Sequence, residues 1–181
     1  MPSKSKEENI LRLLLENSPL REWHFEEIVK ESGVTRAVAN KWLKRYQEEG
    51  LIRREKKKGS FPHFTIGQNN PIYQARKRLY ALSKIHETGL LAELLSMKEA
   101  KTIILFGSMI KGDWYKGSDI DIFILGKTPK INKKAYETRL RHDIELHVFE
   151  NRQELKEIKT GLLKNVANGY LVKGQMQDVV A

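Results

Sequence analysis

The chain has 181 residues, a length that fits two small domains, and no cysteine, which excludes a disulfide framework and thiolate metal sites. Its formal net charge of +10 indicates a polyanionic partner. Because the sequence has no signal peptide and no apolar run of about 18 residues, we expect a cytoplasmic protein with no membrane partner.

The first 68 residues are predicted to form a helical module that ends in a hairpin. A first amphipathic helix precedes Ser18-Pro19, where it closes. A second helix is predicted from about Phe25 to Ser32 and ends at Gly33. Thr35 is a natural N-cap for a third helix, which stops before Gly50. The pattern is therefore a short helix, a tight turn and another helix.

The third helix has an apolar face and a basic, polar face. Ala39, Leu43 and Tyr46 fall at i, i+4 and i+7 and are expected to face the small core. The opposite face carries cationic and amide side chains in an outward stripe, which consists of Arg36, Asn40, Lys41 and Lys44. Residues 51–54 and 61–66 then flank a lysine-rich tip, which predicts a hairpin. The tip lysines are Lys56, Lys57 and Lys58.

A helix-turn-helix followed by a basic hairpin resembles a winged-helix domain, here over about residues 5–68. In winged helices of this kind the third helix typically enters the major groove and the hairpin touches the DNA backbone. The resemblance implies that the outward stripe reads bases or phosphates of double-stranded DNA. It also implies that the three tip lysines hold phosphate, which adds affinity without sequence preference.

Other partners for this module stay open. Lysine-rich faces are ordinary solvated surface in many proteins, and some winged helices bind protein instead of DNA. Residues 1–70 carry 14 basic and 10 acidic side chains, so the positive charge of the chain is not concentrated there.

A connecting helical segment is predicted over residues 69–98, with a boundary at Asn69-Asn70-Pro71. Its helical stretch runs from about Ile72 to Met97, and Gly89 is a candidate break. The apolar residues of this stretch fit a rigid spacer, a packing helix or a dimer surface. We favour packing against the last domain, residues 99–181, together with formation of a homodimer.

A turn and several acidic side chains follow in this last domain. The predicted strand of residues 103–106 runs into Gly107-Ser108 and a helix start, where unpaired backbone N–H groups can hold a triphosphate. In a strand, Asp119 and Asp121 project from one face while their apolar neighbours project from the other. Glu145 lies in a second run that alternates between apolar and acidic residues. The three carboxylates are therefore expected to converge.

Converging carboxylates repel one another, so we interpret these three acids as a site for divalent metal. Oxygen-only ligands favour Mg²⁺ or Mn²⁺. Two such ions about 4 Å apart clamp the attacking and leaving oxygens of an in-line displacement. The five histidines show no metal-ligand spacing. His147 shares a predicted face with Glu145 and could touch substrate, but we expect it to be a structural histidine.

The set of Gly107-Ser108, Asp119-Ile120-Asp121 and Glu145 resembles the polymerase-beta-type nucleotidyltransferase superfamily, and most closely its minimal, stand-alone members. The resemblance covers roughly residues 99–175 and implies an α+β protein with a small mixed sheet flanked by helices. In that family the Gly-Ser turn holds the triphosphate and the paired acids bind both metals. The third acid binds the metal that activates the acceptor hydroxyl. Lys111 stands where many members have a basic residue, which makes it a candidate phosphate contact.

The activity that the resemblance implies is Mg²⁺-dependent transfer of a nucleoside monophosphate from an NTP to a hydroxyl of RNA, a protein or a small molecule. An alternative is a DNA-binding transcriptional regulator whose nucleotidyltransferase domain senses nucleotide or binds a partner. Minimal nucleotidyltransferases often act as antitoxins, so a toxin subunit is a further candidate partner. An inactive relative that keeps the motif is also open.

Two further segments carry structural predictions. The sequence predicts one helix over residues 151–167 and a short closing strand at Tyr170-Leu171-Val172. Trp114 and Tyr115 lie between the Gly-Ser turn and the acidic doublet and could stack on a base. We expect them instead to pack on their own domain.

Overall fold

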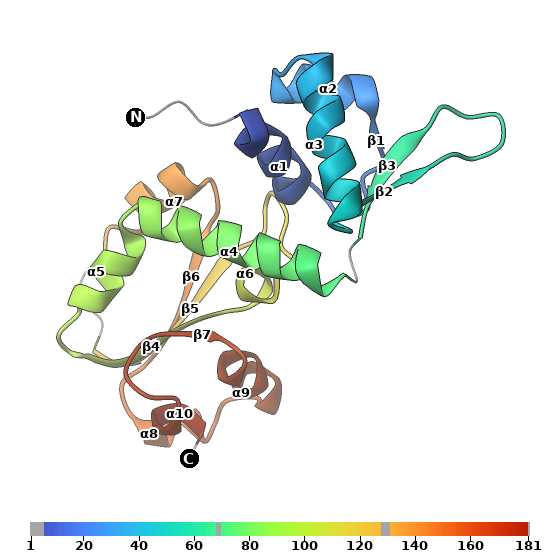
Figure 1. The fold of residues 1–181 in the computed structure, drawn as a ribbon. Helices are drawn as coiled ribbons and strands as arrows, with labels where there is room; N and C mark the ends of the chain where they lie inside the picture. Colours follow the sequence, from blue (N-terminus) through green and yellow to red (C-terminus); the bar gives the residue numbers. More distant parts are fainter. Residues whose placement is uncertain (1–5, 68–69, 128–130, 181) are drawn as a thin grey trace. The chain divides into compact units, whose positions relative to one another are not determined.

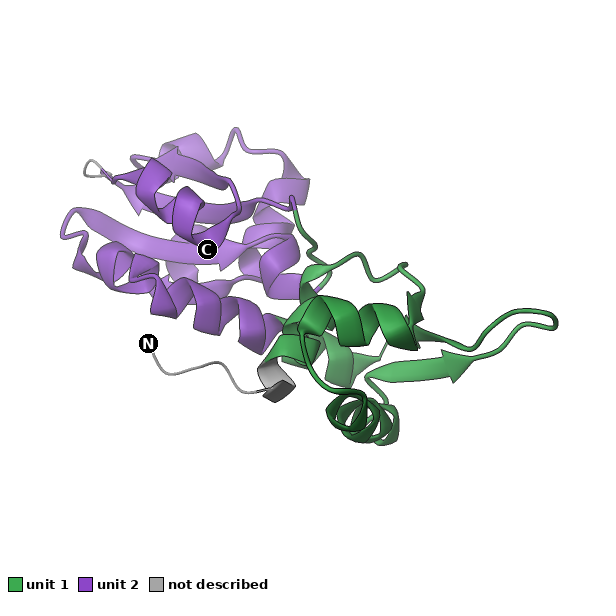
Figure 2. Cartoon of the chain, turned by 90° about the horizontal axis from the view of Figure 1, so that it is seen from above, with its two compact units in different colours: residues 1–77, 113–116 green, residues 78–112, 117–181 purple. Residues whose placement is uncertain are grey.

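The computed structural model describes residues 6–67, 70–127 and 131–180, and its chain divides into two compact units (Figure 2). The N-terminal unit comprises Met1–Lys77 and Asp113–Lys116, and the C-terminal unit comprises Arg78–Gly112 and Gly117–Ala181. The boundaries that the sequence predicts at residues 68 and 98 stay predictions. No helix in the described part of the chain has both the length and the apolar character needed to cross a membrane.

The N-terminal unit combines helices with a small antiparallel sheet (Figure 1). Its elements are α1 (Lys6–Glu16), β1 (Trp23–His24), α2 (Phe25–Ser32), α3 (Arg36–Glu48), β2 (Ile52–Glu55) and β3 (His63–Ile66). Gly33 ends α2 in the left-handed region, with φ 67°. Thr35 caps α3, because its hydroxyl accepts a hydrogen bond from Val38 N at 3.4 Å. The predicted bounds of both helices are confirmed.

The core of this unit follows the predicted apolar face of α3, since Ala39, Leu43 and Tyr46 are all buried. The sheet has the order β1-β3-β2, and β2 and β3 form the predicted hairpin, whose tip extends away from the helices (Figure 1). Strand β1 was not predicted, because Trp23 and His24 are too few residues to carry a periodic pattern. Its pairing with β3 holds the start of α2 against the hairpin.

The helix α4 (Pro71–Glu87) contains the boundary between the two units. Gly89, with φ 84°, separates α4 from α5 (Leu90–Ser96), so the candidate break in the helical stretch is confirmed. The elements that follow are β4 (Ala100–Phe106), α6 (Ser108–Lys111), β5 (Ile120–Gly126), α7 (Lys133–Leu140), β6 (Ile144–Phe149), α8 (Arg152–Leu155), α9 (Thr160–Ala167), β7 (Tyr170–Lys173) and α10 (Gln177–Val180).

The C-terminal unit is built on a mixed sheet of order β6-β5-β4-β7. Strand β5 pairs in parallel with β6, with α7 in the connection between them, whereas β4 pairs antiparallel with β5 and β7. The prediction of an α+β chain with a small mixed sheet flanked by helices is confirmed. Strand β7 is the closing strand that the sequence predicts.

The prediction of one continuous helix over residues 151–167 is wrong, because α8 and α9 are separate helices. Leu155 of α8 and Val166 of α9 are both buried in the same apolar cluster, beside Phe123. In a straight helix these two residues would lie roughly 16 Å apart along the axis. The break therefore folds both onto one face of the sheet. Asn151 supports the separate start of α8, because its side chain accepts from the backbone N–H groups of Gln153 and Glu154.

The N-terminal unit contains a buried lysine, Lys77, which is the last residue of α4 in this unit. Lys77 is 0% exposed, and its Nζ donates a hydrogen bond to Tyr73 Oη at 3.3 Å. The same ammonium lies 5.0 Å from the centroid of the Trp114 ring. Burial lowers the pKa of Lys77 to about 8, and the negative charge of Asp113 opposes this effect. Folding therefore disfavours the charged form of this side chain.

Replacing Lys77 with methionine should remove a pH dependence of stability. The pKa of Lys77 is about 8 in the folded chain, against an ordinary value of 10.5, so the unfolded chain binds the extra proton between these values. The free energy of unfolding of the wild-type protein should therefore rise with pH across this window, by up to about 3 kcal/mol.

Denaturant titrations at about pH 7.5 and about pH 10 measure this rise, because Lys77→Met should lack it while wild type retains it. The matched control is Lys30→Met, which removes an exposed lysine from α2 and should keep the wild-type slope. Equal slopes for Lys77→Met and wild type would contradict the prediction.

Candidate functional site

The turn at Gly107 lies directly against the carboxylate of Asp121. Strand β4 ends at Phe106, which is the register partner of Asp121 on β5. Gly107 then takes φ 75° and ψ −156°, a conformation that is essentially restricted to glycine. A Cβ atom at this position would lie 1.9 Å from Asp121 Oδ2, so the Asp121 side chain would have to shift to accommodate it. The predicted turn and one of the predicted acids are thus brought together, and Ser108 begins α6 beside them.

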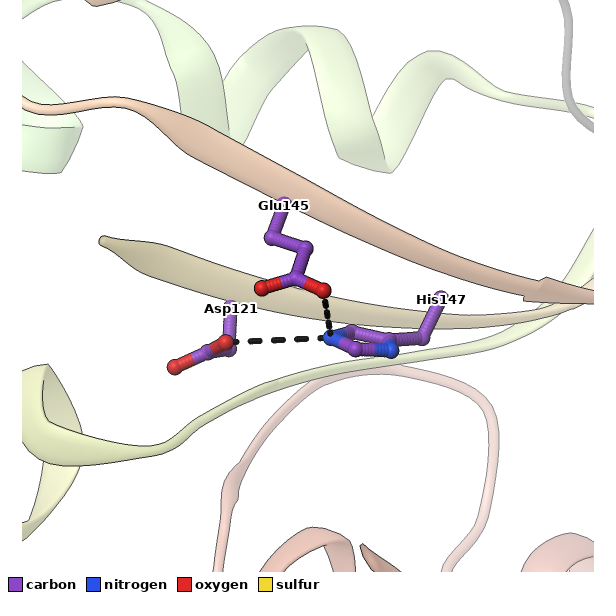
Figure 3. Close-up of side chains that lie close together, drawn as sticks. All are labelled: Asp121, Glu145 and His147. Carbon is purple, nitrogen blue, oxygen red and sulfur yellow. Dashed lines mark ion pairs between the residues drawn. The ribbon is translucent and has the colours of Figure 1, made fainter. Parts of the chain in front are cut away.

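Three side chains on β5 and β6 form a compact group of possible metal ligands, Asp121, Glu145 and His147, which we call the acid–histidine cluster (Figure 3). The parallel register places Asp121 opposite Glu145, and His147 follows two residues later on the same face of β6. His147 Nε2 lies 3.7 Å from Asp121 Oδ1 and 3.6 Å from Glu145 Oε1. One ligand atom from each side chain lies within 4.8 Å of the other two.

The electrostatics of the cluster disfavour a lone carboxylate at Asp121, whose side chain is only 21% exposed. Burial raises the pKa of Asp121 above its ordinary value of 3.8, and the negative charge of Glu145 raises it further. The charge of Asp119 adds a smaller effect in the same direction, and His147 opposes it. A divalent cation between these groups would remove the repulsion and restore the ionised form.

Asp119 lies directly before the strand that carries Asp121. Strand β5 begins at Ile120, whose N–H donates to the carbonyl of Asp143 at 2.8 Å, so Asp119 immediately precedes the strand and its shared face with Asp121 stays a prediction. It lies outside the acid–histidine cluster. Together with Glu145 it lines a cleft whose wall also includes Lys133 of α7. Asp119 is therefore open to solvent beside the cluster, and its charge acts on Asp121.

The structure places His147 beside two of the predicted acids. Its ring packs on Phe106, with centroids 5.1 Å apart, and this contact fixes the orientation of the imidazole. Nε2 is buried and has no hydrogen-bond partner among the described residues, because both nearby carboxylates lie beyond hydrogen-bonding distance. Leaving such an atom unpaired costs about 1–3 kcal/mol. Its place on the same strand face as Glu145 follows from the i, i+2 spacing of the two residues, as the sequence predicts.

Three further residues that the sequence suggested as nucleotide contacts lie outside the acid–histidine cluster. Lys111 Nζ donates to Asn165 Oδ1 of α9 at 2.9 Å, so its role as a phosphate contact stays a prediction. Trp114 is 2% exposed and belongs to the N-terminal unit, where its Nε1 donates to the carbonyl of Lys77 at 3.4 Å. An indole buried in this way is not open for stacking on a base. Tyr115 is 52% exposed.

The residues predicted to contact DNA all lie on the exposed surface of the N-terminal unit; they are Arg36, Asn40, Lys41, Lys44, Lys56, Lys57 and Lys58. Two of them already form ion pairs. Arg36 pairs with Glu26, and Lys57 Nζ lies 2.8 Å from Glu22 Oε1. Because both pairs are largely solvent-exposed, each is weak enough to exchange for a phosphate.

A groove of the N-terminal unit runs between α3 and the hairpin. Arg36, Asn40 and Lys44 line it from α3, and Arg54 and Phe61 line it from the hairpin. Phe61 is 83% exposed. Arg54 was not among the predicted contacts, although its place on β2 next to the tip could have indicated it. The structure therefore brings part of the helix stripe and the hairpin to one surface.

Comparisons with known proteins bear on the C-terminal half. Residues 90–175 match the family model described as Polymerase beta, Nucleotidyltransferase. The chain therefore contains a nucleotidyltransferase-type domain, and the resemblance that the sequence predicts is confirmed for this segment. No curated protein matches the sequence significantly.

Two solved structures are similar to part of the chain. One is a toxin-antitoxin with AMP-PNP, which has 25% sequence identity and a TM-score of 0.36, with 54% of this chain and 77% of that chain covered. The other is a mutant of the toxin-antitoxin MntA-HpeT, which has 20% sequence identity and a TM-score of 0.35, with 57% of this chain and 77% of that chain covered.

Replacing Gly107 with alanine should destabilise the protein more than the same change at Gly117. Both glycines have positive φ, so alanine is strained at either position, but only at Gly107 does the new Cβ meet the Asp121 carboxylate. We expect Gly107→Ala to lower the free energy of unfolding by about 3 kcal/mol and Gly117→Ala by about 1 kcal/mol. Denaturant titrations of both variants measure the difference. Equal losses would show that the contact with Asp121 does not constrain the turn.

Proposed function

We propose that the C-terminal unit transfers a nucleoside monophosphate from an NTP to a hydroxyl acceptor, with pyrophosphate as the leaving group and Mg²⁺ or Mn²⁺ as the cofactor. The observation that carries this proposal is the contact between the Gly107 turn and Asp121, within the acid–histidine cluster. It joins the backbone that would hold phosphate to the carboxylates that would hold metal. The match of residues 90–175 to a nucleotidyltransferase family supports it.

The residues present suit a divalent cation. Asp121 and Glu145 supply carboxylate oxygens, and the buried Nε2 of His147 lacks a hydrogen-bond partner among the described residues. Two such cations, when bound, would neutralise the charge that develops on the attacking and leaving oxygens. Asp119 and Asp121 would hold both ions, and Glu145 would hold the one on the acceptor side.

The acceptor and the triphosphate would use different faces of this site. The Glu145 side chain is 59% exposed, so an acceptor hydroxyl can approach it and give up its proton there. Gly107 and Ser108 would hold the β- and γ-phosphates through backbone N–H groups that have no partner within α6. Lys111, in the last turn of α6, would add a positive charge on leaving its hydrogen bond with Asn165. The bond from the α-phosphorus to the acceptor oxygen forms as the bond to pyrophosphate breaks.

We also propose that the N-terminal unit is a winged-helix domain that binds double-stranded DNA. Its order of helices and strands supports this assignment, because α3 follows α2 after a tight turn and the β2–β3 hairpin follows α3. The groove between α3 and the hairpin places Arg36, Asn40 and Lys44 on one surface with Arg54. A helix in the major groove and a lysine-rich tip on the backbone would use these side chains together. In this proposal the enzyme acts beside a DNA-binding module.

Nucleotidyl transfer should depend on the acidic doublet. Incubation of the full chain with labelled NTP, Mg²⁺ or Mn²⁺ and cell lysate should label an acceptor. Asp119→Asn and Asp121→Asn should each lower labelling at least about a hundredfold, the loss that follows removal of one preorganised charge-stabilising group.

The matched control for this assay is Glu150→Gln, which removes an exposed carboxylate beyond the end of β6 and should label at the wild-type rate. Labelling by the Asp119→Asn and Asp121→Asn variants at the wild-type rate would defeat the enzymatic proposal. Retained DNA binding alongside absent transfer would instead favour a regulator whose nucleotidyltransferase domain senses nucleotide or binds a partner.

The exposed lysines of α3 should contribute to DNA affinity through phosphate. Lys44→Gln should weaken duplex binding for all sequences and reduce the slope of log affinity against log salt by about 0.9, since one counterion release is lost. Fluorescence anisotropy over a salt series measures the slope. Lys30→Gln removes an exposed lysine of α2 outside the groove and should leave the slope unchanged. The same slope for wild type and Lys44→Gln would exclude this contact.

A further inference from the structure

An imidazole nitrogen occupies the third corner of the acid–histidine cluster, which sequence reasoning assigned to oxygen ligands alone. His147 Nε2 lies between the two carboxylates, 3.7 Å from Asp121 Oδ1 and 3.6 Å from Glu145 Oε1 (Figure 3). Both distances exceed those of a hydrogen bond, and the nitrogen is shielded from solvent. A buried nitrogen that faces two carboxylates without bonding to either is suited to a shared cation.

The distances between His147 Nε2 and the two carboxylates also fit a shared cation. Metal–nitrogen and metal–oxygen bonds of about 2.0–2.2 Å place neighbouring ligand atoms roughly 3–3.5 Å apart. The observed separations from Nε2 are slightly larger than this, and all three ligand atoms lie within 4.8 Å of one another. A small inward movement of flexible carboxylates, above all the exposed Glu145, would therefore complete the contacts with an ion.

The surrounding chain holds two of the three ligands in place. The Gly107 backbone lies against the Asp121 carboxylate, so this side chain cannot move toward the turn. Phe106 packs on the His147 ring and aims it across the face of the sheet. The parallel register of β5 and β6 fixes the separation between Asp121 and His147 along the sheet. Nε2 is thus preorganised rather than drawn in by a flexible segment.

We propose that His147 Nε2 is a direct ligand of the metal that Asp121 and Glu145 share, so that the site is a mixed nitrogen–oxygen site that prefers Mn²⁺ to Mg²⁺. Imidazole favours first-row transition metals, whereas Mg²⁺ prefers oxygen ligands and retained water. The catalytic meaning of this ligand rests on the proposed function, because the same ion would serve the acceptor side of the transfer. The coordination itself requires only the geometry of the cluster.

The direct readout is pulsed electron paramagnetic resonance of Mn²⁺ bound to the full-length wild-type protein. A coordinated imidazole gives a ¹⁴N coupling to Mn²⁺, which should be present in wild type and absent in His147→Gln. An absent coupling in wild type would overturn the proposal, and so would failure of wild type to bind Mn²⁺. The wild-type measurement does not depend on whether the variant folds, and the comparison uses His147→Gln that circular dichroism shows to be folded.

Metal selectivity gives a second readout. His147→Gln offers an amide oxygen in place of the nitrogen, so the ratio of Mn²⁺ to Mg²⁺ affinity in calorimetric titrations should fall at least about tenfold. His86→Gln makes the same change at an exposed histidine of α4 and should leave the ratio unchanged. Circular dichroism confirms that both variants fold. An unchanged ratio in folded His147→Gln would overturn the proposal.

Neither readout requires nucleotide or turnover, which separates this inference from the proposed function. If wild type shows the ¹⁴N coupling but transfers no nucleotide, the coordination stands and the proposed enzymatic function fails. If wild type transfers nucleotide but shows no coupling, the enzymatic function stands and His147 is not a ligand.

Discussion

The close approach of the Gly107 backbone to the Asp121 carboxylate constrains the rest of the site. Because a Cβ at position 107 would lie 1.9 Å from Asp121 Oδ2, the turn after β4 and the acid on β5 cannot be placed independently. The antiparallel pairing of Phe106 with Asp121 places the end of β4 next to this carboxylate. The unusual backbone angles of Gly107 then direct the chain into α6 beside it. The backbone that we propose to hold phosphate and a carboxylate that we propose to hold metal thus come from two adjacent strand ends.

Alternation along a strand predicts which side chains share a face, and for this reason the sequence indicates Asp121 and Glu145 correctly as neighbours. It does not give the residue at which a strand begins. Asp119, for example, lies one position before β5. His147 obeys the same alternation as Glu145, but alternation does not show that the His147 ring packs on Phe106. That contact joins residues far apart in sequence.

Features of the fold that depend on neighbouring residues could be predicted from the sequence, whereas features that depend on distant contacts could not. Gly33 and Thr35 act through their own backbone and side chain, so the ends of α2 and α3 follow from the sequence. The break between α8 and α9 depends instead on a shared apolar cluster, onto which both helices fold. Strand β1 exists because β3 offers it a partner, and its two residues carry no signal of their own.

The membership of residues 113–116 in the N-terminal unit makes the division of the chain discontinuous. The segment emerges from the C-terminal unit after Gly112 and returns to it at Gly117, and both glycines have positive φ. Its Trp114 is buried among residues that precede position 78. A fragment that began after residue 77 would therefore expose the Trp114 indole, and a fragment that ended at residue 77 would lack it. A design that separates the two units has to treat residues 113–116 as part of the N-terminal one.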